Sequence, residues 1–519
     1  MAQNDKDKRK LFTSTNCTIS ETINALGFGS YQILLSFCLG IVLLSCAVEV
    51  FLFIMLPPLL NCYWGESDGE SGKYSTSILV VTIMMKCVAP VWGYISDYFG
   101  RKPALIISVL LQLLLIIVII NTQGKSLVLI FKLIYSCCLS ALPIIYVLLA
   151  EYCPSTSRGQ SIMFLQIYWF GGEILTILIS WTFIKDVDGW KGIAMIGIPL
   201  LSVFGVMCYW IPESLLFLSK SEKEQKVGSQ IKDVARLNGT NGVLNQIQIT
   251  NVLTTDGTLK DPCLEFFRLI LSPETCYTCL IIWSLWFLNG IAYYGIIFSG
   301  LAILRGLDSC YTKTNDDINI FADELESCHV LVTSGYEHVI VNTVAEFPAI
   351  LIGAIMIDVL GRKRTFITCT GTFSACLIPL IIRHCEINQT WTSILLFITR
   401  GAAMIWFTTN IVFTLENYST KVRCTGLGTG YCFMQLGAIL AVAIRKYVMA
   451  YSLSLSIFVY FAIGSFGLIF GIYLPSDTAT KDLGHIGEVI TERVEAISIE
   501  YIPSKSIEIR RKKIARKKS

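Results

Sequence analysis

Eight predominantly apolar stretches of the sequence run for at least 18 residues without an Asp, Glu, Lys or Arg. They lie between Glu21 and Glu49, Lys102 and Lys125, Lys132 and Glu151, Lys191 and Glu213, Glu274 and Arg305, Arg364 and Arg383, Arg423 and Arg445, and Lys446 and Asp477. A helix of about 20 apolar residues crosses the roughly 30 Å of hydrocarbon in a bilayer. Windows with one or two interior charges lie at roughly 33–60, 75–96, 161–184, 337–359 and 392–415. The first of them overlaps the first uncharged stretch, so the prediction is about twelve transmembrane helices.

The composition excludes a soluble protein. Hydrophobic residues make up 54% of the chain and charged residues 15%, whereas soluble domains carry about 25% charge. A formal net charge of +3 gives no reason to expect a nucleic-acid partner. The apolar stretches lack the alternation of lipid-facing strands, so we expect an all-α protein embedded in the lipid bilayer.

The second half of the chain repeats charged motifs of the first half. Asp97 and Arg101 recur as Asp358 and Arg362, 261 positions later, and Glu151 and Arg158 recur as Glu416 and Arg423, 265 positions later. Pro212 of a Pro-Glu-Ser segment recurs as Pro475, 263 positions later. Three matches in one order at nearly one offset indicate two six-helix halves, and parallel halves around a midplane site are typical of transporters.

These motifs resemble the major facilitator superfamily. The similarity rests on Gly93-x-x-x-Asp97-x-x-Gly100-Arg101-Lys102, on Glu151-x-x-Pro154-x-x-x-Arg158-Gly159, and on Pro212-Glu-Ser. More narrowly, the chain resembles the synaptic-vesicle-2-related transporters and the sugar and organic-ion porters, over about residues 27–478. The segments are Gly27–Gln32, Ala47–Val50, Asn61–Trp64, Trp286–Gly295, Ala345–Pro348 and the alternate glycines Gly426, Gly428 and Gly430. The resemblance implies twelve helices in two pseudo-symmetric six-helix bundles.

The sequence departs from the family at four positions. Related proteins carry an acidic pair in the first helix, where this chain has Cys46 and Glu49. Ala354 replaces a glycine, Ser419 replaces a proline, and Lys132 stands where the fourth helix usually has Arg. These changes preserve the predicted fold but put an inherited coupling mechanism in question.

Charged residues inside a membrane are costly, so we treat each one as a functional candidate. The candidates for substrate or coupling-ion binding are Glu49, Lys86, Glu173, Glu346 and Arg400. Structural roles compete with this interpretation: an ion pair between Glu49 and Lys86, an ion pair between Glu346 and Arg400, and helix packing beside Gly171 and Gly172 for Glu173. Lys132 and Arg400 could also extend toward the membrane surface.

Aromatic and amide side chains are the second group of candidates, because they suit organic cations and orient a substrate. The seventh predicted helix provides Trp283, Trp286, Asn289, Tyr293 and Tyr294. Packing is the competing role for each of them.

Eight charged residues at helix ends predict a cytoplasmic gate. In sugar porters, which the chain resembles, acids of one half pair with bases of the other when the carrier faces outward. This resemblance implies pairs between Glu151 and Arg423 and between Glu416 and Arg158, flanked by Asp97 with Arg101 and Asp358 with Arg362. Anchoring of the topology is the competing role.

The remaining expectations concern organisation and chemistry. We expect a cytoplasmic tail over 1–32, a bundle over 33–211, a cytoplasmic loop over 212–272, a second bundle over 273–475 and a basic cytoplasmic tail over 476–519. Cys310 and Cys328 are the candidate disulfide. Cys276-x-x-Cys279 has no second pair, and no spacing suits a metal or nucleotide, so we expect no metal, no cofactor and no enzyme activity.

We therefore predict a monomeric secondary carrier that moves a small organic solute by alternating access, in the plasma membrane or in an intracellular vesicle. An organic ion is the favoured substrate, with proton coupling as an option. An uncoupled facilitator and a non-transporting receptor or scaffold of a vesicle membrane are the alternatives.

Overall fold

A computed structural model describes residues 17–63, 79–122, 125–183, 210–220, 224–240, 252–253, 261–312, 333–382 and 389–474 of the chain. Within these residues eleven helices are long and apolar enough to cross a membrane. The remaining predicted span, the sixth, falls mostly on residues 184–209, outside the described part. The described helices match the other predicted windows, so the twelve-helix fold class is confirmed.

The first half contains α3 (Ser30–Tyr63), the short 3-10 helix η1 (Lys86–Val88), α5 (Ala89–Phe99), α6 (Arg101–Asn121), α7 (Lys125–Leu139), α8 (Pro143–Ala150) and α9 (Arg158–Phe183). One span runs from Ser126 to Ala150 and is divided into α7 and α8. The division falls just before Pro143, whose missing N–H and fixed ring suit the first position of a new helix.

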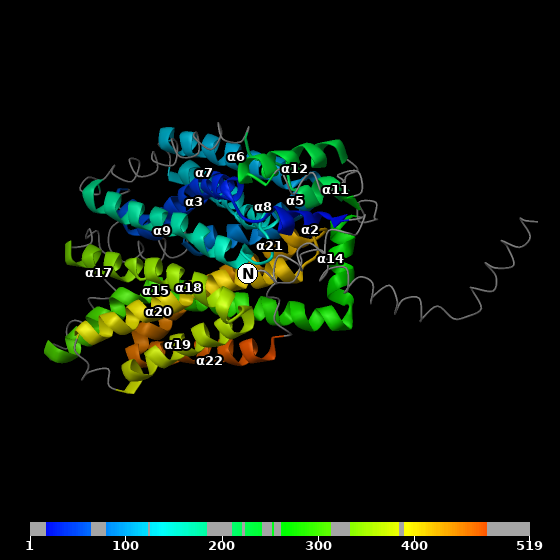
Figure 1. Ribbon diagram of the computed structural model, residues 1–519. Coiled ribbons are helices and arrows are strands. Elements are labelled where there is room, and N and C mark those ends of the chain that lie inside the picture. The colour runs from blue at the N-terminus through cyan, green and yellow to red at the C-terminus, as the bar shows by residue number, and fades with distance from the viewer. Residues whose placement is uncertain are drawn as a thin grey trace, which may run out of the picture.

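The second half contains α15 (Pro273–Thr312), α17 (Thr333–Val344), α18 (Glu346–Val359), α19 (Arg362–Ile382), α20 (Gln389–Asn417), α21 (Arg423–Ala443), the π-helical segment η3 (Ile444–Met449) and α22 (Leu453–Tyr473). In Figure 1 the two halves lie side by side, with the first half in blue and cyan and the second in green to orange. The halves meet where α5 packs on α21 and where α9 packs on α17, α18 and α20.

Shorter elements gather at one end of the bundles. They are α2 (Ile19–Leu26), α11 (Leu215–Lys220), α12 (Glu224–Asn238) and α14 (Pro262–Leu271), and Figure 1 shows them at the same end. Two-residue strands, β1 (Cys17–Thr18) and β2 (Val252–Leu253), pair in parallel. Asn238 of α12 donates to the Gly27 carbonyl and to Gln32, and Gln32 donates to the Tyr152 carbonyl, so the Gly27–Gln32 motif attaches α12 to the bundle.

Glycines let α5 and α21 approach closely across the two halves. A Cβ at Gly428 of α21 would lie 2.6 Å from the carbonyl oxygen of Ala89, and a Cβ at Gly93 of α5 would lie 2.4 Å from that of Cys424. Both distances are too short for backbone atoms to tolerate. Close packing of α21 against α5 therefore explains why the alternate-glycine motif has a glycine at Gly428.

We predict that Gly428→Ala separates α5 from α21 and destabilises the purified protein by about 1–3 kcal/mol, as overpacking does. Thermal unfolding in detergent measures the change. Gly371→Ala in α19 is the matched control, because its Cβ would find its nearest atom 3.9 Å away. Equal melting temperatures for Gly428→Ala and wild type would show that the helices do not need this approach.

Candidate functional site

Charged residues of both halves meet at the end of the bundles where α8, α9, α20 and α21 begin or end. We call Asp97, Arg101, Glu151, Arg158, Asp358, Arg362, Glu416 and Arg423 the end cluster. Across the halves, Arg423 Nη1 lies 2.6 Å from Glu151 Oε1, and Arg158 Nη1 lies 3.6 Å from Glu416 Oε1. The structure thus forms both pairs that the repeat and the sugar-porter resemblance implied.

Pairs within each half complete the end cluster. Arg101 contacts Asp97 at 3.2 Å and Glu151 at 3.3 Å, while Arg362 contacts Glu416 at 2.9 Å and Asp358 at 4.0 Å. All eight side chains except Asp358 are at most 2% exposed. These pairs are buried, and removing one partner of a buried ion pair is far more costly than removing one at the surface.

Helix termini bind two of the carboxylates at this end. Asp97 of the first half accepts hydrogen bonds at 2.8 Å from the Thr425 backbone N–H and hydroxyl and at 3.3 Å from the Cys424 N–H, so it caps α21 of the second half. Glu213 of the Pro-Glu-Ser segment accepts from the Arg101 N–H at 2.9 Å, at the start of α6. Burial raises the pKa of Glu213 above its ordinary value.

Glu151 is the residue that joins the two halves most directly, because it contacts Arg101 of its own half and Arg423 of the other. Burial opposes ionisation of its carboxyl group, but the two guanidinium groups outweigh burial and hold the pKa of Glu151 below its ordinary value. The carboxylate is therefore charged at neutral pH and bound on both sides.

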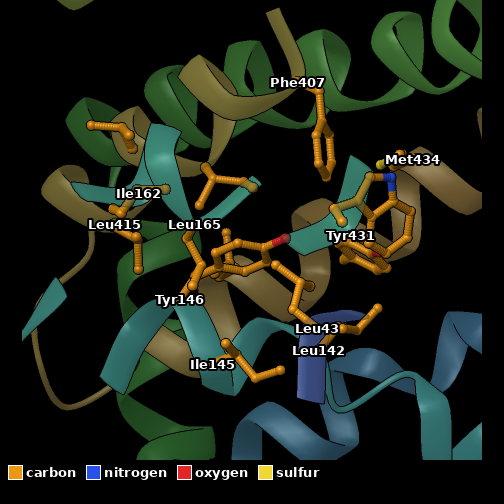
Figure 2. Packing of buried hydrophobic residues seen from close by; sticks show 14 of the residues in the cluster. Leu43, Leu142, Ile145, Tyr146, Ile162, Leu165, Phe407, Leu415, Tyr431 and Met434 are labelled. Carbon is orange, nitrogen blue, oxygen red and sulfur yellow. The ribbon is translucent and has the colours of Figure 1, made fainter. Parts of the chain in front are cut away.

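An apolar layer lies next to the end cluster. Figure 2 shows Leu43, Leu142, Ile145, Tyr146, Ile162 and Leu165 of the first half facing Phe407, Leu415, Tyr431 and Met434 of the second half. Tyr146, Ile162 and Tyr431 are buried and lie 4 to 8 residues from Glu151, Arg158 and Arg423. Ile162 and Leu165 of this layer follow Arg158 along α9.

A second group of charges lies deeper, and we call Trp169, Glu173, Tyr293, Glu346 and Arg400 the middle cluster. Glu173 is 15 residues beyond Arg158 on α9, which corresponds to about 22 Å along the helix axis at about 1.5 Å per residue. Arg400 Nη2 lies 3.0 Å from Glu173 Oε2 and also forms an ion pair with Glu346. The side chains are at most 2% exposed, so Arg400 does not extend to the membrane surface.

Aromatic residues surround these charges. Trp169 Nε1 donates to Glu173 at 2.8 Å, and the Tyr293 hydroxyl lies 2.9 Å from Glu173 Oε1 and 3.0 Å from Glu346 Oε1. The Arg400 guanidinium lies over the Tyr293 ring, 4.3 Å from its centre. The middle cluster therefore also spans both halves, through α9 on one side and α15, α18 and α20 on the other.

Glu49 and Lys86 are both buried in the first half. Glu49 interacts electrostatically with Lys132 of α7, whereas the structural alternative considered from the sequence was an ion pair with Lys86. One carboxylate oxygen of Glu49 is buried with no hydrogen-bond partner among the described residues. The sequence did not indicate that Lys132 faces Glu49, because the spacing of residues along one helix does not show which neighbouring helix it faces.

The five aromatic and amide candidates on α15 have different surroundings. Trp286 is fully buried and donates to Thr414 at 3.0 Å, Asn289 donates to the Ala403 carbonyl at 3.4 Å, and Trp283 stacks on Phe433. These three hold α15 against α20 and α21. Tyr293 belongs to the middle cluster, and Tyr294 lies beside Gln435 of α21.

Uncharged polar residues that the sequence analysis missed lie between the clusters. The Tyr146 hydroxyl and the Gln166 amide are 3.3 Å apart, and the amide of Gln435 is buried with no hydrogen-bond partner among the described residues. The sequence signal that could have identified Gln166 and Gln435 is an amide side chain inside an otherwise apolar window.

The predicted disulfide between Cys310 and Cys328 stays a prediction, because Cys328 lies outside the described residues and the side chain of Cys310 is not described. Cys276 and Cys279 are free thiols.

No group of three or more His, Cys, Asp and Glu suited to a metal occurs in the part of the chain that the structure describes.

Comparison with known proteins identifies the family. The sequence model described as the Major Facilitator Superfamily matches residues 36–310, which is more than half of the chain.

The chain belongs to the major facilitator superfamily.

Individual relatives agree with this assignment. The chain is 28% identical to the synaptic vesicle 2-related protein of Rattus norvegicus, over 91% of this chain and 83% of that protein. It is 24% identical to the organic cation/carnitine transporter 7 of Arabidopsis thaliana, over 82% of this chain and 87% of that protein. The chain is accordingly a transporter-family membrane protein and not an enzyme.

Solved structures show the same fold. The proton:xylose symporter XylE bound to 6-bromo-6-deoxy-D-glucose gives a TM-score of 0.68 at 14% identity, covering 89% of this chain and 99% of that chain. The human organic anion transporter MFSD10 gives a TM-score of 0.58 at 12% identity, covering 85% and 99%. These neighbours support the fold that the internal repeat predicted.

We predict that Glu151→Gln destabilises the protein by about 3–5 kcal/mol, because it leaves the buried Arg101 and Arg423 without their shared carboxylate. Thermal unfolding of the purified protein measures the loss. Glu265→Gln is the control: its partner Arg268 is 55% exposed at 3.6 Å, so this pair contributes about 0–1 kcal/mol.

The pH dependence gives a further check of this prediction. A lowered native pKa means that Glu151 stabilises the fold fully above the ordinary carboxyl pKa of about 4.3 and loses this contribution as the pH falls through the native value. The acid-induced loss of stability should therefore be smaller in Glu151→Gln. Equal losses in both proteins would contradict the assigned role.

Proposed function

We propose that this protein is a secondary active transporter that moves a small organic ion across a membrane by alternating access, coupled to protons. The single observation that carries the proposal is the pair of buried ion pairs, Glu151 with Arg423 and Arg158 with Glu416, that join the two halves at one end. Bonds of this kind close one side of the protein and can break when the halves rock apart.

The closed end is proposed to face the cytoplasm. Two basic turns, Arg101-Lys102 and Arg362-Lys363-Arg364, lie there, and basic residues favour the cytoplasmic side. Both termini then also lie in the cytoplasm. The middle cluster lies deeper in the membrane, and the protein acts as a monomer because each chain contains both halves.

An organic ion is the substrate class that the described polar groups support. The Tyr146, Tyr294, Tyr431 and Gln435 side chains offer hydrogen bonds and aromatic faces between the two clusters, and Glu49 offers a buried carboxylate for a cation or a proton. The name of the Arabidopsis relative, an organic cation/carnitine transporter, agrees with this class.

The test begins with a thermal-shift screen of a metabolite collection against the purified protein. Each stabilising compound is then offered to proteoliposomes with and without an imposed pH gradient. We expect saturable uptake that an inward proton gradient increases. Uptake that ignores proton and sodium gradients would identify an uncoupled facilitator. Binding without uptake would identify a receptor, a class that the acid replaced by Cys46 makes worth testing.

Glu49→Gln tests the site in the same assay. We predict that this isosteric change abolishes uptake or its pH dependence, because the amide cannot bind a proton or a cation. Glu21→Gln, at an exposed position of α2, is the matched control and should transport normally. Normal, pH-sensitive uptake by Glu49→Gln would remove Glu49 from the mechanism.

A further inference from the structure

Two cysteines face each other across the contact between the two halves. Cys87 belongs to η1 of the first half, and Cys432 belongs to α21 of the second half. Cys87 Sγ lies 3.9 Å from the backbone oxygen of Cys432, and the two side chains are hydrogen-bonded to each other. The pair belongs to neither of the two charged clusters.

The close packing of α5 on α21 explains how two thiols from opposite halves can meet. Gly428 of α21 packs on the Ala89 carbonyl, where a Cβ would lie 2.6 Å from the oxygen. Cys432 follows Gly428 by four residues, and Cys87 precedes Ala89 by two. The helices run antiparallel, so both shifts lead in the same direction along the contact. A disulfide requires Cα atoms about 4.4–6.8 Å apart, a separation that helices reach only where their backbones come close.

Both thiols of the pair are within reach of a small oxidant. Cys87 and Cys432 are partly exposed, whereas Cys424, eight residues earlier on α21, is buried beside the Ser96 hydroxyl. Oxidation of cysteine depends on exposure, and a second thiol beside the oxidised one converts it to a disulfide. Hydrogen peroxide is small and uncharged, so a position inside the membrane does not exclude it.

We propose that Cys87 and Cys432 are a redox modification site, at which hydrogen peroxide forms a disulfide that ties the first half of the protein to the second. The bond joins η1, at the start of α5, to α21 and keeps these helices from separating. Oxidation therefore holds the protein in its closed arrangement, and a small thiol releases it by exchange with the disulfide.

The step is a two-electron oxidation of the pair by one molecule of hydrogen peroxide. The O–O bond breaks as the peroxide oxidises one thiol to a sulfenic acid, and the first water leaves. The sulfur of the second thiol then displaces the hydroxyl group, which takes the proton of that thiol and leaves as a second water. Two S–H bonds are lost and one S–S bond is formed, and the peroxide oxygens receive the two electrons.

A cut between the halves detects this disulfide in the full-length protein. A protease site inserted between residues 240 and 252 allows the purified chain to be oxidised whole with hydrogen peroxide, blocked with N-ethylmaleimide and then cut. We expect the two fragments to stay joined on a non-reducing gel and to separate with dithiothreitol. Cys87→Ser and Cys432→Ser should each give separate fragments. Cys376→Ser is the matched control and should keep them joined, because Cys376 is also partly exposed but lies on α19.

Mass spectrometry gives a second readout that needs no variant. The digest of oxidised wild type should contain one pair of peptides joined through Cys87 and Cys432. Fragments of oxidised wild type that separate without dithiothreitol would overturn the proposal. Joined fragments in Cys87→Ser, or a linked peptide pair without Cys432, would overturn it as well.

Uptake in proteoliposomes tests the consequence of the bond, which rests on the proposed alternating access. Oxidised wild type should lose uptake in proportion to the fraction of joined chains and regain it with dithiothreitol, while Cys87→Ser should be insensitive to peroxide. Full uptake by joined chains would overturn the claim that the bond holds the halves closed. An absence of uptake in the reduced protein would instead refute the proposed function and leave the gel and the linked peptides unchanged.

Discussion

Glu151 and Glu416 each hold a guanidinium group of their own half and one of the other half, and the closed arrangement of the two bundles depends on this sharing. Arg101 and Arg423 converge on Glu151, while Arg362 and Arg158 converge on Glu416. A carboxylate inside a membrane protein needs such partners, because lipid and apolar side chains offer none. These residues lie at the ends of α6, α8, α9, α19, α20 and α21, and the charges are buried where the two halves meet.

The end cluster and the middle cluster lie at different depths in the protein and differ in their numbers of acidic and basic groups. The end cluster has four acids and four bases, so opening it costs ion pairs. The middle cluster has two carboxyl groups facing one guanidinium group. Along α9, Ile162 and Leu165 of Figure 2 lie between Arg158 of the end cluster and Glu173 of the middle cluster. Close approaches such as that of Gly428 to Ala89 favour one packed arrangement over intermediate ones.

Much of this arrangement was predictable from the sequence. Helices followed from uncharged windows, and the two halves followed from the repeat of Asp97 with Arg101 and of Glu151 with Arg158. The pairing of Glu346 with Arg400 was foreseen as an alternative to a substrate role. What the sequence did not indicate was that Glu173 joins this pair from the other half, or that Glu49 faces Lys132. The spacing of residues along one helix shows which of them share a face. It does not show which other helix packs against that face, because that depends on how helices far apart in the chain come together.

A distance measured across the end cluster tests most directly whether its ion pairs hold the two halves closed. Spin labels on noncanonical amino acids at Thr156, an exposed residue between α8 and α9, and at Lys421, between α20 and α21, report the separation of the halves without disturbing the native cysteines. Wild type should give a short distance. Neutralising Arg158 and Arg423 together, as Arg158→Gln with Arg423→Gln, should shift the population toward a longer one. An unchanged distance distribution in a folded double variant would contradict the claim that these ion pairs hold the two halves closed.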